Sequence, residues 1–112
     1  MLDNAFFVSD TIHEREVELA DGSKHKLYFK EVPAGAYRRF AFDTESDKEQ
    51  VRIDAMARLV TASLVTPDGK SAITFEQAKK LKAAPMLSIF LAIQEVNGVA
   101  TPKTETGDSG TS

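Results

Sequence analysis

The chain has 112 residues, enough for one compact domain at about 100 to 200 residues per domain. Hydrophobic residues make up 42% and charged residues 28%, which excludes a wholly disordered chain. The formal net charge of −3 offers no overall attraction for nucleic acid, and the absence of Cys excludes thiolate chemistry. We therefore expect a protein that is not an enzyme and that carries no cofactor or metal.

The first ten residues lack the basic start and the long apolar stretch of a secretory signal, because their apolar part, residues 5–8, is only four residues long. The longest uncharged run, residues 83–94, is shorter than the roughly 20 apolar residues of a spanning helix. These features predict a cytoplasmic protein without membrane association.

Two segments, residues 14–20 and 24–32, alternate apolar and charged residues around Asp21-Gly22-Ser23 and predict a β-hairpin. An odd-numbered loop is needed to place the apolar side chains of both strands on one face. Two registers meet this condition. With residues 20–22 in the loop, the charged pairs are Glu16 with Lys26 and Glu18 with Lys24. With residues 21–23, they are Glu18 with Lys26 and Glu14 with Lys30.

Helical patterns follow the hairpin. A short helix is predicted over residues 34–42, and a central one over residues 48–64 with a Ser46–Glu49 capping box and a polar stripe of Gln50, Asp54, Arg58 and Thr61. A second capping box, Thr74 with Gln77, begins a helix that runs to about residue 83. Pro85 either kinks that helix or opens a new one.

The last helix, residues 85–97, is followed by Gly98, a common stop signal. The predicted fold is therefore α+β, with an N-terminal antiparallel hairpin packed on a bundle of three to four helices. Residues 1–98 would form the single folded domain. Residues 99–112 are rich in Thr, Ser and Gly and are expected to form a flexible tail.

The last helix carries more apolar surface than one small core needs. One stripe contains Met86, Ile89, Phe90, Ile93 and Val96, and a second contains Leu87 and Leu91. The second stripe indicates either deep burial or contact with another chain, and both readings remain open. The candidate surface for partner binding or self-association comprises Leu87, Leu91, Phe90 and Met86.

Three other groups of residues are candidates for a phosphate-binding site, a metal site and a nucleic-acid-binding face. Gly69-Lys70-Ser71 copies the end of a P-loop, but Leu64 stands where the first Gly belongs, so a turn is favoured. His13 and His25 are too few for a metal site and fit ordinary strand positions. The lysines near residue 80 suggest an alternative function, a small regulatory or nucleic-acid-binding protein, through the face formed by Lys79, Lys80 and Lys82.

The stretch VRIDAMARLVTASLV at residues 51–65, followed by Pro67-Asp-Gly-Lys, Phe75, residues 78–81 and residues 85–98, resembles the tail assembly chaperones of long-tailed, lambda-like bacteriophages with non-contractile tails. The hairpin sequence Val-Glu-Leu-Ala-Asp-Gly is similar to the N-terminal part of that family. The resemblance covers roughly residues 14–98.

The resemblance implies a non-enzymatic role in virion morphogenesis in the host cell cytoplasm. Members of the family bind the tape measure protein, keep it soluble, help to recruit tail tube subunits and are absent from the mature virion. The resemblance also implies self-association. A longer form made by ribosomal frameshifting would have its junction after Gly98.

The residues beyond Gly98 are mostly polar and should contribute little to stability. Truncation after Gly98 is expected to leave the melting temperature nearly unchanged, because the removed residues have little apolar surface to bury. Thermal unfolding of the full-length and shortened chains measures the difference, and a drop of several degrees would contradict a flexible tail.

Overall fold

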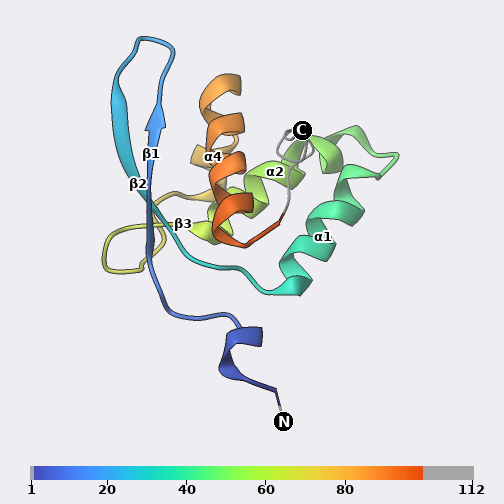
Figure 1. Ribbon diagram of the computed structural model, residues 1–112. Helices are drawn as coiled ribbons and strands as arrows, with labels where there is room; N and C mark the ends of the chain where they lie inside the picture. Colours follow the sequence, from blue (N-terminus) through green and yellow to red (C-terminus); the bar gives the residue numbers. More distant parts are fainter. Residues whose placement is uncertain (1, 100–112) are drawn as a thin grey trace, which may run out of the picture.

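The computed structural model describes residues 2–99 (Figure 1). Strands β1 (His13–Glu18), β2 (Lys24–Phe29) and β3 (Leu64–Val65) form an antiparallel sheet in the order β1-β2-β3. The helices are α1 (Ala34–Thr44), α2 (Glu49–Ser63), α3 (Phe75–Ala78) and α4 (Ala83–Val96), and a 3-10 turn, η1 (Asn4–Phe6), precedes the sheet. The predicted α+β class is confirmed. Of the expected tail, all except Val99 lies outside the described residues.

The hairpin adopts the first of the two predicted registers. Glu16 pairs with Lys26 and Glu18 with Lys24, so the alternative register is wrong. Gly22 takes a φ of 87°, the left-handed geometry that closes a three-residue loop at little cost for glycine. Hydrogen bonds from the hydroxyl and backbone amide of Ser23 lower the pKa of Asp21 and fix this turn.

One face of the sheet is buried and the other faces solvent, as the alternation predicts. Val17 and Phe29 are buried on the face that α4 covers, whereas Glu14, Glu16 and Glu18 are exposed on the other. Figure 1 shows α4 lying alongside the hairpin, with α2 behind it. The sheet therefore supplies one wall of the core.

Helix α2 differs from its prediction at both ends. It begins at Glu49 after Lys48, and the predicted capping box is wrong because the Ser46 hydroxyl accepts instead from the Lys48 amide, 3.0 Å away. It ends at Ser63, where Leu64 turns to extended geometry and starts β3. The sequence pattern did not predict this strand, because Leu64 and Val65 continue the helical periodicity of the residues before them.

The polar stripe predicted on α2 is also wrong in part. Asp54 is only 8% exposed, and its carboxylate accepts a hydrogen bond from the Gln50 side chain. Helices α1, α3 and α4 all contact α2, and Asp54 is among the residues of α2 that the fold covers. The carboxylate remains buried because Gln50 supplies a donor.

The segments that flank Pro85 form two helices. The Thr74–Gln77 capping box is confirmed, but α3 is a single turn that ends at Ala78 and does not continue to residue 83. Pro85 lies in the first turn of α4, where its missing N–H has no cost. After α4, Gly98 has a φ of 71°, and the Val99 amide donates to the Gln94 carbonyl at 2.8 Å, which forms a Schellman motif.

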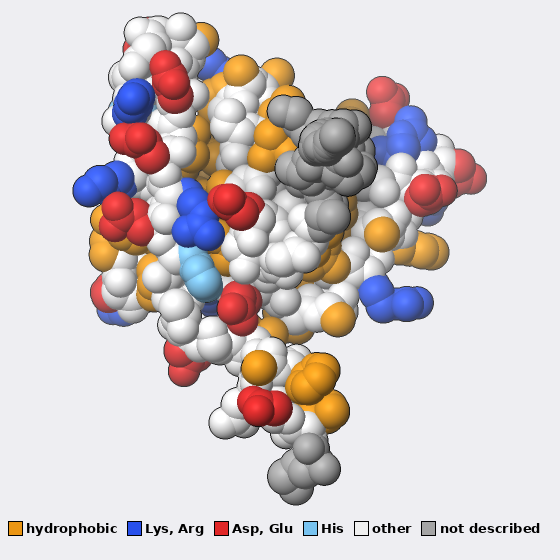
Figure 2. All heavy atoms as spheres, viewed as in Figure 1, with side chains coloured by type: hydrophobic (Ala, Val, Ile, Leu, Met, Phe, Trp, Pro, Cys, Tyr) orange, Lys and Arg blue, Asp and Glu red, His pale blue; other side chains and the backbone are white. Residues whose placement is uncertain are grey.

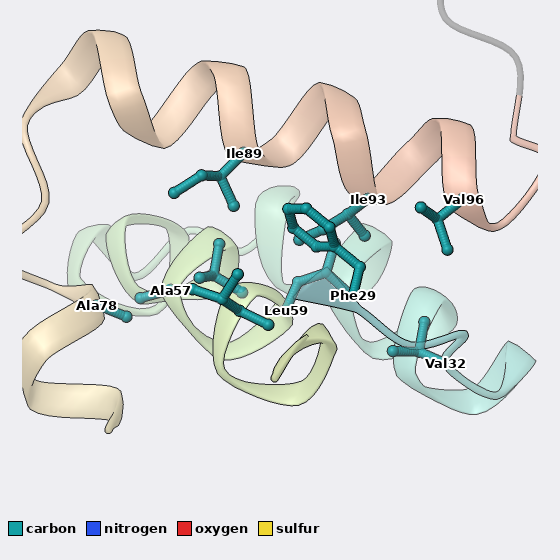
Figure 3. Close-up of a cluster of buried hydrophobic side chains, with 10 residues drawn as sticks. Phe29, Val32, Ala57, Leu59, Ala78, Ile89, Ile93 and Val96 are labelled. Atoms are coloured by element: carbon teal, nitrogen blue, oxygen red, sulfur yellow. The ribbon is translucent and has the colours of Figure 1, made fainter. Parts of the chain in front are cut away.

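The core lies where β2, α2 and α4 meet. Figure 3 shows Ile89, Ile93 and Val96 projecting from α4 toward Phe29 and the side chains of α2. Ser63 is fully buried among them, and its hydroxyl donates to the Lys30 carbonyl at 2.8 Å. In return, the Lys30 amide donates to the Ser63 carbonyl, so the end of α2 is joined to the end of β2.

Asn97 makes the corresponding connection for α4. Its side-chain oxygen accepts from the Val32 amide at 2.8 Å, and its NH₂ group donates to the Ile93 carbonyl at 2.8 Å. The Tyr37 hydroxyl approaches the same carbonyl at 3.4 Å, and burial raises the pKa of Tyr37. The C-terminal end of α4 is thereby fixed to the segment between β2 and α1.

This connection predicts that Asn97→Ala lowers the free energy of unfolding by about 1–3 kcal/mol, because a buried Val32 amide loses its acceptor. Urea unfolding measures the loss. Gln94→Ala is the matched control, since Gln94 lies on the same helix and makes no side-chain hydrogen bond within residues 2–99. An equal effect of the two substitutions would contradict the assigned role of Asn97.

Candidate functional site

The candidate site is the outer face of α4, which we define by Leu87 and Leu91. Leu87 is 54% exposed and Leu91 is 36% exposed. Both lie on a helix that carries no charged residue from Ala83 to Gln94. The reading that both leucines belong to the core is therefore excluded for this chain by itself. The outer face is an apolar strip without a partner in the described part of the chain.

Helical geometry explains why the two leucines face outward. Ile89 and Ile93 are almost fully buried against α2 and β2. Leu87 and Leu91 each precede one of these residues by two positions, which corresponds to about 200° around the helix axis. Packing of the isoleucines therefore turns both leucines away from the core.

The other two predicted partner-binding residues lie elsewhere on the helix. Met86 and Phe90 are half-buried and pack against the core cluster. The rings of Phe90 and Phe40 are 5.2 Å apart between centroids, which joins α4 to α1. The structure thus separates the predicted set into two exposed leucines and two residues that pack inward.

An ion pair joins α4 to the hairpin at the protein surface. The Arg15 guanidinium on β1 donates to the Glu95 carboxylate at 2.8 Å, and Arg15 side-chain exposure is 33%. Figure 2 shows hydrophobic side chains on the surface over α4, next to a hairpin surface that carries both signs of charge. The apolar strip therefore has a charged border on the hairpin side.

The lysine cluster is arranged differently from its prediction. Lys79, Lys80 and Lys82 lie in the turn between α3 and α4, because α3 ends at Ala78. The Lys79 ammonium pairs with Glu76 at 3.5 Å and lies 5.0 Å from the centre of the Phe75 ring. Of the three lysines, Lys79 is thus engaged by contacts with Glu76 and Phe75.

The P-loop-like segment is a tight turn, as expected. The Gly69 amide donates to the Thr66 carbonyl at 2.8 Å, and the Lys70 amide donates to the Thr66 hydroxyl at 3.1 Å. Gly69 has a φ of 89°, which suits the turn. These two amides are therefore occupied and do not form a phosphate cradle.

The histidines occupy different rungs of the hairpin. His13 lies opposite Phe29 and 3.6 Å from the Glu31 carboxylate, whereas His25 lies opposite Val17 and contacts the Ser23 hydroxyl. Within residues 2–99, no three side chains of metal-binding type converge. No helix in this part of the chain has the length and apolar character needed to cross a bilayer.

Comparisons with family models, with curated proteins and with solved structures found no match to this chain. A function for this chain is therefore inferred from its own surface and from its resemblance to tail assembly chaperones.

Sequence reasoning missed several other exposed apolar side chains. Phe42 on α1 and Ile53 on α2 are 74% and 59% exposed. The N-terminal segment exposes Leu2, Phe6, Phe7 and Val8. Its short apolar run was visible in the sequence, but periodicity cannot show whether so short a run is covered.

The exposure of the outer face predicts that Leu87→Asp and Leu91→Asp each leave a folded protein. The free energy of unfolding should fall by no more than about 1 kcal/mol for Leu87→Asp and by about 1–2 kcal/mol for Leu91→Asp, because Leu91 is only 36% exposed. Ile89→Asp is the control, because it places a carboxylate at a buried position of the same helix and should unfold the chain. Circular dichroism with thermal unfolding distinguishes these outcomes. Collapse of both leucine variants would show that the strip is core.

Proposed function

We propose that the chain is a tail assembly chaperone of a long-tailed bacteriophage. In this role it binds the tape measure protein in the host cell cytoplasm, keeps that protein soluble and helps to recruit tail tube subunits, without becoming part of the mature virion. The chain acts by binding and not by catalysis.

The observation that carries this proposal is the outer face of α4. A client with long apolar helices needs a limited apolar surface on its chaperone. Leu87 and Leu91 provide one on a helix that packs into the core through Ile89 and Ile93 and is joined to the rest of the fold by Asn97. Contiguous exposed apolar surface on a small domain is typical of a protein-binding site. A strip of this size gives weak single contacts, which suits a partner long enough to bind many copies.

The alternative, binding of nucleic acid through the lysine turn, has less support. Lys79 is engaged by Glu76 and Phe75, and the chain has 17 acidic against 14 basic residues. A gel shift with the triple substitution Lys79→Glu, Lys80→Glu and Lys82→Glu tests it. Salt-sensitive binding that the substitutions abolish would favour this alternative.

The chaperone proposal predicts that co-expression of this chain with the tape measure protein of the same phage raises the soluble fraction of the tape measure protein severalfold. Combined substitution of Leu87→Asp and Leu91→Asp should remove most of that increase, because two charges would have to be desolvated on binding. The measurement is the amount of tape measure protein in the soluble fraction.

Ile53→Asp is the matched control, because Ile53 is 59% exposed, close to Leu87 at 54%, but lies on α2. This control should retain the solubilising effect. A tape measure protein that is equally soluble with and without the chain would refute the chaperone function. A dependence on the chain that survives the leucine substitutions would refute only the assigned surface.

A further inference from the structure

The N-terminal segment forms an apolar arm, which we define as residues 2–10. Every residue of the arm is exposed, and the side chains of Phe6 and Phe7 are 72% and 57% exposed. Within the described chain, two side-chain hydrogen bonds join the arm to the rest of the fold: the Ser9 amide donates to the Glu31 carboxylate at 2.9 Å, and the neighbouring Thr11 amide donates to the Ser9 hydroxyl at 3.3 Å. Figures 1 and 2 show the arm projecting from the body, with hydrophobic side chains on its surface.

A hollow of complementary character lies between α1 and α2. It has a volume of about 100 Å³ and an apolar lining of Ala36, Phe40, Ala55, Leu59 and Ala62. Three of these five residues are alanines, whose short side chains leave the space between the helices unfilled. Arg39, Asp43 and Arg58 complete the lining.

We propose that the arm of one copy of the chain docks on a second copy by inserting one ring of the Phe6–Phe7 pair into this hollow. The ring would replace water in an apolar space and contact the alanines of both helices. Apolar cavities of about 150 Å³ accept benzene, so a single aromatic ring is the right class of occupant for a somewhat smaller hollow that opens to solvent.

Charge favours the same pairing. The arm carries Asp3 and Asp10 and has no Lys or Arg. The hollow presents Arg39, Arg58 and Asp43, and the Arg39 guanidinium donates to the Asp43 carboxylate at 2.9 Å. This pair leaves one net positive charge at the hollow, on Arg58, whose guanidinium lies 5.0 Å from the centre of the Phe75 ring. An apolar arm with two carboxylates therefore meets an apolar hollow that carries one net positive charge.

The arm of the same chain does not fill the hollow. Arm residues 5–8 instead border a separate space beside Val32, Ala34 and Val96, and arm residues 8–10 border another space, which shares Ala62 with the hollow. Because arm and hollow are different surfaces, each copy can donate one arm and accept another. Such a contact produces chains or rings of copies, of which a pair that exchanges arms reciprocally is the smallest. Each contact is small, so association is weak and depends on concentration.

This inference deepens the proposed function, because a row of copies suits a long client, but it is tested with the purified chain and no client. Sedimentation should show the wild type growing from monomer to larger species between about 10 µM and about 1 mM. The double substitution Phe6→Ser and Phe7→Ser removes the ring. Ala62→Phe fills the hollow at an exposed position of α2. Each variant by itself should stay monomeric.

Mixing the two variants gives the sharpest outcome. The intact arm of the filled variant can enter the intact hollow of the armless variant, so the mixture should form a one-to-one dimer that does not grow further. Phe42→Ser is the matched control, because it also removes an exposed ring and Phe42 is 74% exposed. The Phe42→Ser variant should associate like the wild type. Circular dichroism verifies that all variants are folded.

Three results would overturn the inference: a wild type that stays monomeric throughout, variants that associate like the wild type, or a mixture that does not dimerise. A wild type that stays monomeric is also the result expected if the arm docks on its own chain. Each of these results leaves the co-expression test of the chaperone function unaffected, so failure of one proposal is distinguishable from failure of the other.

Discussion

The burial of one side of α4 is the constraint on which the rest of the structure depends. Ile89, Ile93 and Val96 fill the space between β2 and α2, and Ile93 and Phe29 are fully buried. Each large side chain removed from water in this way contributes about 1.5–3 kcal/mol. That packing fixes the rotation of α4, and the rotation determines which residues of an almost uncharged helix face solvent.

Polar connections hold the same arrangement at its ends. Ser63 and Lys30 exchange two hydrogen bonds between α2 and β2, and Asn97 joins α4 to the segment that follows β2. These contacts connect backbone groups that would otherwise be buried without partners. These hydrogen bonds connect the ends of the three elements that build the core, including the helix that carries the outer face.

The surface that results has apolar features in separate places. The outer face of α4 is a strip on a well-anchored helix, whereas the arm is a short segment with few contacts to the body. The hollow between α1 and α2 exists because small residues line it. In the functions proposed for these surfaces, the strip would bind the client and the arm would bind a second copy. The two surfaces can then be occupied together, because they share no residue.

Local patterns in the sequence determined much of this fold. Alternation determined which face of the hairpin is buried, and Thr74, Pro85 and Gly98 marked helix ends through local backbone chemistry. Only the tertiary structure decided between the two hairpin registers, turned Leu64 and Val65 into a strand, buried Asp54 and exposed Leu87 and Leu91. The reason is physical: periodicity shows which residues share a face, but the neighbours that cover a face come from distant parts of the chain.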